Sequence, residues 1–468
     1  MTDTRTIIEM TQGNEEDKLF EGAFNSVLHT DKKDYPSYIG GMKVASGIDF
    51  PVSSPIDRTI RFGLFQEPED DLADEAVDSA LKAFKEWSKT EPGIRADVFE
   101  SFLNALKKQR YRVAAMVMLS SGMIRSRALG ETDRLIEVIE GEIKKVREGF
   151  KGKPTGVWAI ISEHNSPIAA PFGYAAAAML SGNTVVMMPS RYAPVPVYMM
   201  YDILSPALPL GTINIITDRR GKATMHLTEN EDIAGIAAIG SGDRTEEMMF
   251  MQTDEELRFI NEVKGMNPVI IHKPHSMTQA VNSLIVDAFS YSGQDISSCS
   301  KVIVLAEEQK EFVNALMKAC SGLKVGDPAD RDTLIGPIIS EGMMNTFLSI
   351  VESCRDNVIY GGDRVMNDIT KEGFYVRPAV LTGLHADHDL NNIDNGLPIL
   401  SVQVAEDIDE AMEMMNTCDV GRFSGLYSKD ERLIARFRSE AVAETIYVND
   451  PHSIPKCALL CRMEEFVK

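Results

Sequence analysis

The stretch VWAII at residues 157–161 opens a series of short apolar runs that decides the fold. Longer segments of helical character separate each run from the next. Strands and helices that alternate at this spacing are typical of a parallel sheet covered by helices. The further strand-like runs are NTVVMMP (183–189), TINIIT (212–217) and IAAIG (236–240), and the helical segments between them are SPIAAPFGYAAAAMLSG (166–182) and PVPVYMMYDILS (194–205).

A second alternating series follows in the C-terminal part of the chain. Apolar runs lie at 267–273 (NPVIIHK) and 300–306 (SKVIVLA), and helical segments lie at 307–322 and 407–417. The pattern predicts two α/β units in sequence, which meet near residue 260.

The chain before residue 156 is predicted to be mostly helical. Apolar residues recur at helical spacing in the segments 73–87, 95–122 and 132–150, which indicates helices that turn one face to a core. Earlier in the chain, the stretch YIGGMKVASG (38–47) suggests a hairpin. We assign no chemistry to these segments.

The composition is that of a packed, acidic protein. The 468 residues include 48 Lys and Arg against 70 Asp and Glu, a formal net charge of −22, and 44% are hydrophobic. An acidic surface repels phosphate backbones and anionic lipids, so we expect neither a nucleic-acid partner nor a membrane. The apolar runs are too short for a transmembrane helix and the N-terminus is polar, which favours a cytoplasmic protein.

The six cysteines are sparse and far apart, so a disulfide framework is not expected. Cys457 and Cys461 are close in the sequence, as are His385 and His388, but neither pair has the further ligands that a structural metal needs. We therefore predict no metal site.

Eight motifs resemble, in the correct order, successive landmarks of the aldehyde dehydrogenase superfamily, over about residues 35–450. Within it, the chain looks most like the pyrroline-5-carboxylate (glutamate-semialdehyde) dehydrogenase branch, through AFKEWSKTEPGIRADVF (83–99) and GQDISSCSK (293–301). The eight motifs are VWAIISEHNSP (157–167), GNTVVMMPS (182–190), LPLGTINIIT (208–217), AAIGSG (237–242), FINEVKGMNPVII (259–271), FSYSGQDISSCSKVIV (289–304), IGPIIS (335–340) and IYVN (446–449).

The resemblance implies an α/β fold in which a Rossmann-like cofactor domain and a catalytic α/β domain enclose the site. On that basis we predict N-terminal helices and the dinucleotide-binding domain in 1–260, the catalytic domain in 261–430, and a return to the cofactor domain in 431–468. The implied activity is NAD(P)-dependent oxidation of an aldehyde or semialdehyde to the acid, through a covalent bond to a thiol.

Two catalytic positions of the family are kept. Asn165, in EHNSP, matches the oxyanion asparagine, and Glu262, in NEVKG, matches the general-base glutamate. Each residue also has a structural alternative: Asn165 could cap the helix that begins near Ser166, and Glu262 could be a solvated residue at a strand end. We favour the catalytic assignment for both.

The nucleophile position carries no sulfur. In the family a Gly-Gln pair is followed by one residue and then by the catalytic cysteine, but here GQDI places Ile296 at that position. A branched hydrocarbon cannot attack a carbonyl. Cys299, three residues on, is a candidate for a displaced nucleophile, although the resemblance favours a packed, non-catalytic cysteine at that position.

The expected cradle for the adenosine ribose is also altered. The family's Lys-Pro-Ser-Glu reads MPSR here (188–191), so the resemblance leaves Ser190 and Arg191 as contacts and removes the ribose-binding lysine. Arg191 could attract a 2′-phosphate and favour NADP, or it could be an ordinary surface arginine. Both alternatives stay open.

The rest of the cofactor site is partly kept. The phosphate-binding turn is present as Gly240, Ser241 and Gly242, whose small size lets backbone N–H groups approach a pyrophosphate. The carboxylate that holds the nicotinamide ribose is matched by Asp394, without the phenylalanine that accompanies it in the family. We expect NAD or NADP as the cofactor, with a loosely held nicotinamide.

Two segments used in the family's oligomerisation are expected to be missing. Only KGKPTG (151–156) joins the helix ending near Phe150 to the next strand, where the family usually places a strand of its flap. The chain stops about twenty residues after Asn449, before a closing strand. We therefore expect a monomer, or a dimer through another surface, in place of the family's tetramer.

Two functional hypotheses remain. The first is an aldehyde dehydrogenase that oxidises an aldehyde or semialdehyde with unusual nucleophile chemistry. The second is a catalytically inactive family member, a pseudoenzyme that serves as a ligand-binding, scaffold or regulatory protein. The joint loss of the thiol, the ribose lysine and the phenylalanine favours the second hypothesis. Asn165, Glu262 and the turn at 240–242 still allow ligand binding or reversible carbonyl addition.

Overall fold

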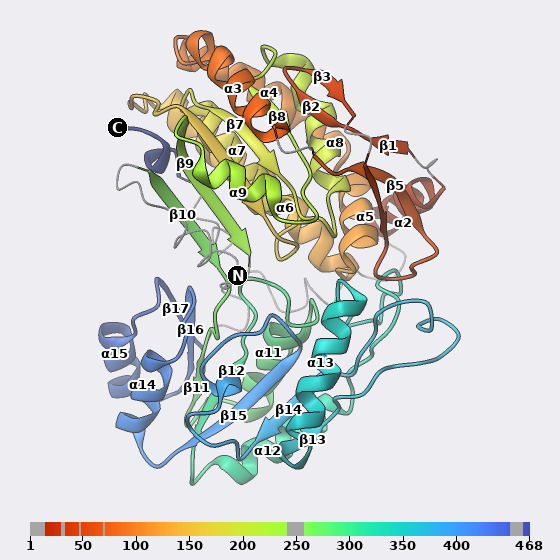
Figure 1. The fold of residues 1–468 in the computed structure, drawn as a ribbon. Coiled ribbons are helices and arrows are strands. Elements are labelled where there is room, and N and C mark those ends of the chain that lie inside the picture. Colours follow the sequence, from red (N-terminus) through yellow and green to blue (C-terminus); the bar gives the residue numbers. More distant parts are fainter. Residues whose placement is uncertain (1–14, 30–32, 46–47, 69–70, 241–256, 450–461) are drawn as a thin grey trace.

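The computed structural model describes residues 15–29, 33–45, 48–68, 71–240, 257–449 and 462–468. It contains two seven-stranded sheets, each covered by helices, and Figure 1 shows them one above the other. We call the parts built around them the first and the second domain. The predicted α/β class, with two units in succession, is confirmed.

The first sheet is parallel over most of its width. Its strands are β2 (Ser37–Ile39), β3 (Met42–Val44), β6 (Val157–Ser162), β7 (Thr184–Met188), β8 (Ile213–Ile215), β9 (Ile233–Gly240) and β10 (Arg258–Val263). They lie in the order β10-β9-β6-β7-β8-β2-β3, and only β2 and β3 are antiparallel to their neighbours. The apolar runs predicted as strands form β6 to β9, which are neighbours in this sheet.

The predicted hairpin at 38–47 is present as β2 and β3. Ile39 pairs with Met42 across a two-residue turn made by Gly40 (φ +59°) and Gly41 (φ +76°). A turn with positive φ at both central residues matches the twist of the strands that it joins, and glycine adopts this conformation without steric cost.

Both faces of the first sheet are buried along β6 to β9, which explains why these strands are apolar runs without alternation. In β6, Val157, Ala159 and Ile161 face one group of helices, and Trp158 and Ile160 face the other. The first group consists of α3 (Leu72–Trp87) and α9 (Lys222–Glu229). The second consists of α4 (Pro92–Lys108), α5 (Arg110–Ser121), α6 (Arg125–Arg147), α7 (Ala169–Leu180) and α8 (Val195–Leu204).

The second sheet is parallel except at one edge. Its strands are β11 (Val269–Ile271), β12 (Lys301–Leu305), β13 (Val358–Tyr360), β14 (Ala379–Thr382), β15 (Ile399–Ala405), β16 (Phe423–Tyr427) and β17 (Thr445–Val448). Their order is β13-β14-β15-β12-β11-β16-β17, with β13 antiparallel to β14. The helices α11 (Met277–Phe289) and α12 (Gln309–Cys320) cover one face, and α13 (Glu341–Ser353), α14 (Ile408–Thr417) and α15 (Glu431–Glu440) cover the other.

A small sheet and one helix precede these domains. The sheet has the order β1-β5-β4, with β1 (Lys33–Tyr35), β4 (Asp49–Ser53) and β5 (Arg61–Gln66). In the helix α2 (Glu15–Leu28), the buried Asp17 pairs with Arg125 of α6 at 3.3 Å and with Arg331 of the second domain. This ion-pair cluster ties α2 to both domains.

The chain changes domain later than predicted at both boundaries. β10, which extends to residue 263, pairs with β9 in the first sheet. β17 pairs with β16 in the second sheet, so residues 431–448 remain in the second domain. The return to the first domain is made by the 3-10 helix η4 (Met463–Phe466), where Phe466 packs against Trp158 with ring centroids 4.4 Å apart.

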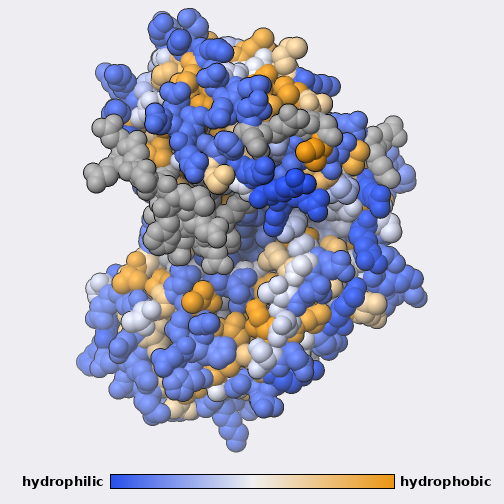
Figure 2. Space-filling view, viewed as in Figure 1, coloured by the Kyte–Doolittle hydropathy of each residue, from blue (hydrophilic) through white to orange (hydrophobic). Residues whose placement is uncertain are grey.

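The surface carries mainly polar side chains on the face in view (Figure 2). Apolar side chains gather on this face only in small areas. Within the part of the chain that the structure describes, no helix is both long and apolar enough to cross a bilayer.

Candidate active site

The first sheet contains a topological switch point between β6 and β9. The chain passes from β6 to β7 and β8 on one side and then crosses back, so that β9 pairs with the other edge of β6. In open parallel sheets, ligands bind beyond the carboxyl ends of the strands at such a point. We call this place the β6/β9 crevice. It is bordered by Glu163, His164 and Asn165, which follow β6, and by Gly240 at the end of β9.

Asn165 connects the β6/β9 crevice to the loop that precedes β12. Its Nδ2 donates a hydrogen bond to the carbonyl oxygen of Gln294 at 2.8 Å, and this contact fixes which amide atom is nitrogen. Its Oδ1 is buried and has no partner in the described parts of the chain. A Cβ placed on Gly240 would lie 3.5 Å from this oxygen, so the free acceptor lies beside the end of β9.

The start of α7 is capped without Asn165. Ala170 N donates to Ser166 Oγ at 2.9 Å, and Ala169 N donates to Glu131 Oε1 at 2.9 Å. Ser166 Oγ in turn donates to the same Glu131 oxygen at 2.6 Å. The helix cap, which was the structural alternative for Asn165, is therefore provided by Ser166 and by Glu131 of α6.

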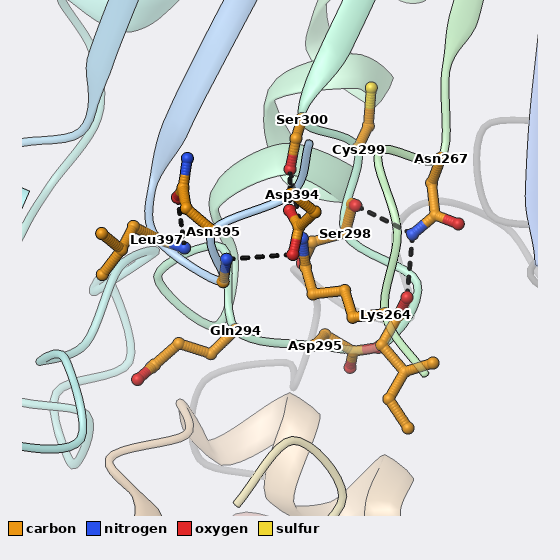
Figure 3. Close-up of polar contacts among 12 residues, drawn as sticks. Lys264, Asn267, Gln294, Asp295, Ser298, Cys299, Ser300, Asp394, Asn395 and Leu397 are labelled. Atoms are coloured by element: carbon orange, nitrogen blue, oxygen red, sulfur yellow. Dashed lines mark hydrogen bonds and ion pairs between the residues drawn. The ribbon is translucent and has the colours of Figure 1, made fainter. Parts of the chain in front are cut away.

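Ile296, at the family's nucleophile position, is used in packing. The residue is 7% exposed, and its side chain belongs to the same buried apolar cluster as Ile239 of β9 and Tyr291. The main chain around it is held by Asn267, whose Nδ2 donates to the carbonyl oxygens of Ile296 at 2.8 Å and Ser298 at 3.0 Å (Figure 3). The Ile296 side chain thus anchors the loop that precedes β12 to the core of the first domain.

Cys299 lies in the core of the second domain. Its side chain is buried in a cluster with Phe289 and Val302, and its Sγ donates to the carbonyl oxygen of Lys301 at 3.2 Å. Burial raises the pKa of this thiol well above its ordinary value, because the thiolate would lose its hydration. In Figure 3 the sulfur points away from the cluster formed by Lys264, Asp394 and Ser300.

Glu262, on β10, is only 2% exposed, so it is not the solvated residue of the structural alternative. One carboxylate oxygen accepts a hydrogen bond from the hydroxyl of Tyr174 at 2.6 Å, and the other pairs with Arg422 of the second domain. The Nε of Arg422 also lies 3.0 Å from Glu444 Oε2. These four side chains help to line a cavity of about 440 Å³ beside β10.

A buried ion pair joins the two domains beside the loop that precedes β12. The ammonium of Lys264, whose side chain is 1% exposed, pairs with Asp394 Oδ1 and lies 3.1 Å from Ser300 Oγ. Ser300 Oγ donates to the same Asp394 oxygen at 2.7 Å, and Gly396 N donates to Asp394 Oδ2 at 2.9 Å (Figure 3). Both oxygens of the predicted ribose-binding carboxylate are therefore engaged within the protein.

Lys264 is not among the site residues predicted from the sequence. The signal was available, because a lysine in NEVKGM directly follows a strand and stands between two apolar segments. Its partner, Asp394, is 130 residues away in the sequence. A single sequence does not reveal a pairing over such a separation.

The predicted adenosine contacts lie after β7. Met188 is buried and offers no donor. Ser190 is buried, and its Oγ accepts a hydrogen bond from Tyr192 N at 3.3 Å. Arg191 is exposed: it donates to the carbonyl oxygen of Arg219 and to the hydroxyl of Tyr192, both at 2.9 Å, and its guanidinium lies 4.8 Å from the centre of the Tyr192 ring.

Gly240 is the one residue of the predicted phosphate turn that the structure describes. Its φ is +146°, and a Cβ at this position would run into the side chain of Glu163. Glycine at position 240 therefore lets the end of β9 lie close to the residues after β6, and any side chain at this position would prevent that approach. Ser241 and Gly242 lie outside the described residues.

His164 is likewise not among the residues predicted from the sequence, although it directly precedes Asn165. It is 6% exposed, and neither ring nitrogen has a hydrogen-bond partner among the described residues. The ring meets that of Tyr192 edge-on, with centroids 5.9 Å apart, and its Nδ1 lies 3.9 Å from Glu163 Oε2. Tyr291 fixes the main chain here by donating its hydroxyl to the His164 carbonyl oxygen at 3.0 Å.

The residues considered as metal ligands do not form a described cluster. Over the described ranges, no group of three or more His, Cys, Asp or Glu side chains is placed to hold an ion. His388 Nε2 lies 3.6 Å from Cys354 Sγ, and His385 is exposed. Cys457 and Cys461 lie outside the described residues.

Similar sequences point to one enzyme family. The model of the aldehyde dehydrogenase family matches residues 44–459. The 1-pyrroline-5-carboxylate dehydrogenase of Geobacillus sp. (strain WCH70) is 27% identical over 456 residues, which cover 92% of this chain and 88% of that protein. The enzyme of the same name from Bacillus subtilis (strain 168) is 26% identical over 441 residues, which cover 89% and 85%.

Solved structures agree in fold. A mutant of Thermus thermophilus 1-pyrroline-5-carboxylate dehydrogenase has a TM-score of 0.88 with 22% identity, over 94% of this chain and 90% of that one. A mutant of betaine aldehyde dehydrogenase from Staphylococcus aureus has a TM-score of 0.86 with 22% identity, over 91% and 89%. With the family model matched over most of its length, this chain belongs to the aldehyde dehydrogenase family.

Proposed function

We propose that this family member binds a nucleotide in the β6/β9 crevice and does not oxidise aldehydes through a thiol. The observation that carries the proposal is the position of Ile296, whose side chain is buried in the core cluster of the first domain. A nucleophile at this point would have to approach a carbonyl, but here the position supplies apolar packing. The chain would thus act as a ligand-binding or regulatory protein.

Cys299 does not replace the missing nucleophile in this proposal. A covalent mechanism needs a thiolate, and the raised pKa of this thiol keeps it protonated at neutral pH. The sulfur is also packed among side chains of the second domain, where a substrate carbonyl has no access without local opening.

The position matched to the general base supports the same conclusion. A base must accept a proton from a water molecule within hydrogen-bonding distance. Both oxygens of Glu262 already have partners, Tyr174 and Arg422, and protonation of the carboxylate would remove the charge that pairs with Arg422. A buried ion pair that loses one of its charges is strongly destabilised, so the pairing resists such a change.

The residues at the β6/β9 crevice fit the phosphate-bearing part of a dinucleotide. His164 and Asn165 present polar atoms that have no partner among the described residues, and Gly240 keeps the end of β9 free of a side chain. A nicotinamide ring would supply the hydride acceptor for oxidation, but Asp394, the carboxylate matched to its ribose, is paired with Lys264. A Thermus 1-pyrroline-5-carboxylate dehydrogenase of the same fold was solved with bound NAD, and we propose NAD or NADP as ligands here.

A second candidate function is favoured by the names of the relatives. Two relatives that are 27% identical to this chain are named 1-pyrroline-5-carboxylate dehydrogenase, which makes NAD(P)-dependent oxidation of a semialdehyde the alternative. In that case Cys299 would be the displaced nucleophile, Asn165 would donate its second amide hydrogen to the oxyanion, and Glu262 would leave Arg422 during the reaction.

Turnover and binding assays distinguish the two functions. The purified protein is mixed with short-chain aldehydes or glutamate semialdehyde and with NAD or NADP, and the absorbance of the reduced cofactor is followed. We expect no steady reduction, while titration calorimetry registers nucleotide binding. Steady turnover that disappears in Cys299→Ala would establish the second function, and the absence of any nucleotide binding would contradict the first.

We also propose that the protein is a monomer, or a dimer through a surface other than the family's. The short connection before β6 supports this, because it pairs with the chain's own C-terminal residues. Pro154 and Val467 form an antiparallel bridge, and Lys468 N donates to Lys153 O at 2.9 Å. We expect light scattering to give a mass of 51.7 kDa or twice that value, and four times that value would contradict the proposal.

A further inference from the structure

We propose that a cavity of about 210 Å³ at the C-terminal end of α7 binds a small monocarboxylate, whose charge is held by the guanidinium of Arg95 and the ammonium of Lys151. The cavity is bordered by the start of α4 and by the ends of α6 and α7. Because α7 has 12 residues, about 18 Å of helix separate this cavity from the β6/β9 crevice near the other end of α7. The site is therefore separate from the proposed nucleotide site.

Arg95 is a buried cation without an acidic partner among the described residues. Three arginines are buried there, with exposures of 6%, 6% and 7%. Two of them, Arg125 and Arg422, each pair with two carboxylates. Arg95 donates instead to the carbonyl oxygens of Leu180, at 2.8 Å, and of Thr90. Buried charges in proteins are ordinarily paired, so the missing partner of Arg95 indicates an anion that comes from outside the chain.

The carbonyl contacts neutralise the Arg95 guanidinium only in part. Leu180 is the last residue of α7, and a helix C-terminus carries about half a negative elementary charge. Burial lowers the pKa of Arg95 because the cation loses hydration, but a guanidinium stays ionised inside a protein. Two of its five N–H groups donate to the carbonyl oxygens, and the other three have no partner within the described ranges. These three groups can donate to a ligand.

The lining of the cavity suits an anion that has an apolar body. It includes two cations, Arg95 and the exposed Lys151, and none of the described residues that line it is acidic. Four lining residues are apolar: Pro92, Val146, Phe150 and Leu180. A carboxylate would bind to the cations while its hydrocarbon part covers the apolar walls, whereas inorganic phosphate would leave these walls in contact with water.

The volume of the cavity limits the ligand to a small molecule. At about 30 Å³ for each water molecule in the liquid, 210 Å³ has room for about seven non-hydrogen atoms. Butanoate is of this size. With its carboxylate at Arg95, its propyl group would lie against Val146 and Phe150.

Titration calorimetry with sodium butanoate tests the proposal. Wild-type protein is expected to show one saturable site, and butylammonium, which has the same hydrocarbon chain and the opposite charge, is expected not to bind. Lys151→Glu should weaken butanoate binding by about three- to tenfold, because it reverses one exposed charge at the site. Lys153→Glu makes the same change in net charge at an exposed lysine that does not line the cavity, and it should bind like wild type.

A third variant, Arg95→Gln, removes the buried charge and should weaken butanoate binding by about 10- to 100-fold, the range for a hydrogen bond to a charged group. If this variant fails to fold by circular dichroism, because α7 loses the contact at Leu180, the two lysine variants decide alone.

The absence of saturable binding at millimolar butanoate would overturn the proposal, as would equal weakening by Lys151→Glu and Lys153→Glu. Inorganic phosphate that binds more tightly than butanoate would overturn the assignment to a monocarboxylate. Titration of the same samples with NAD keeps the two sites distinguishable. Failure to bind NAD would contradict the proposed function and leave the butanoate site in place.

Discussion

Replacing Lys264 by methionine is expected to lower the free energy of unfolding by about 3–5 kcal/mol, the cost of leaving one member of a buried ion pair without its partner. Asp394 would stay buried beside Ser300 with no cation, while the apolar stem of the lysine would be largely preserved. Urea denaturation followed by circular dichroism measures the change. The pair crosses between the domains, so we also expect the transition to lose cooperativity.

A double variant serves as the control. In Lys264→Met with Asp394→Leu neither charge remains, and such replacements are often neutral or even stabilising. We therefore expect the double variant to recover most of the stability that Lys264→Met loses. A single variant as stable as wild type would mean that the pair is solvated, and that Asp394 is free to bind a ribose.

The second large effect is expected at Cys299. Iodoacetamide should modify this thiol at least about a hundredfold more slowly in the native protein than in urea, because reaction needs both a thiolate and local opening. Peptide mass spectrometry identifies the modified residue. Ser321→Cys, at an exposed position after α12, provides a reactive thiol on the same chain for comparison. Labelling of Cys299 as fast as that of the control would contradict its burial.

The Cys299 thiol also makes the free energy of unfolding depend on pH. Its pKa is raised in the folded protein, so the unfolded chain ionises at a lower pH than the folded one. The contribution of this thiol to the free energy of unfolding is therefore fully present below the ordinary thiol pKa. It is lost as the pH rises above that value. We expect Cys299→Ala to flatten the alkaline part of the stability curve, as measured by urea denaturation at a series of pH values. An unchanged alkaline slope would contradict this assignment.

Much of the fold could be predicted from the sequence, because burial on both faces of a parallel sheet leaves a plain signal. The strands β6 to β9 and the helices α3, α7, α8, α12 and α14 all appear where apolar runs and helical periodicity indicate them. The segment 95–122 was predicted as one helical pattern but forms α4 and α5, separated at Gln109. The domain limits were less accurate, since pairing of β10 with β9 and of β17 with β16 is decided by tertiary contacts.

The candidate site was less predictable, for a physical reason. Motif spacing identifies which position is altered, as at Ile296, but not what the new side chain touches. The pairing of Lys264 with Asp394 and of Glu262 with Arg422 joins residues 130 and 160 apart in the chain. The lack of described partners for the ring nitrogens of His164 is likewise a property of its surroundings. None of these contacts leaves a periodic or local pattern.

These contacts have a common consequence. Three positions matched to catalysis or cofactor binding make contacts with other residues of the chain. Ile296, at the nucleophile position, packs in a core cluster. Glu262, matched to the base, pairs with Arg422, and Asp394, matched to the ribose-binding carboxylate, pairs with Lys264. Each contact involves residues of both domains, so groups matched to catalysis stabilise the association of the domains. At the β6/β9 crevice, by contrast, polar atoms lack partners among the described residues, and this is why we propose binding without oxidation.

The most direct test is a single-turnover experiment with protein in excess over NAD. In the covalent mechanism one hydride is transferred for each nucleophile before any base is needed, so a burst of reduced cofactor would appear even with Glu262 held by Arg422. Rapid mixing with glutamate semialdehyde and detection by absorbance measure its amplitude. We predict no burst from wild-type protein. A burst that converts most of the NAD to its reduced form, absent in Cys299→Ala, would contradict this prediction.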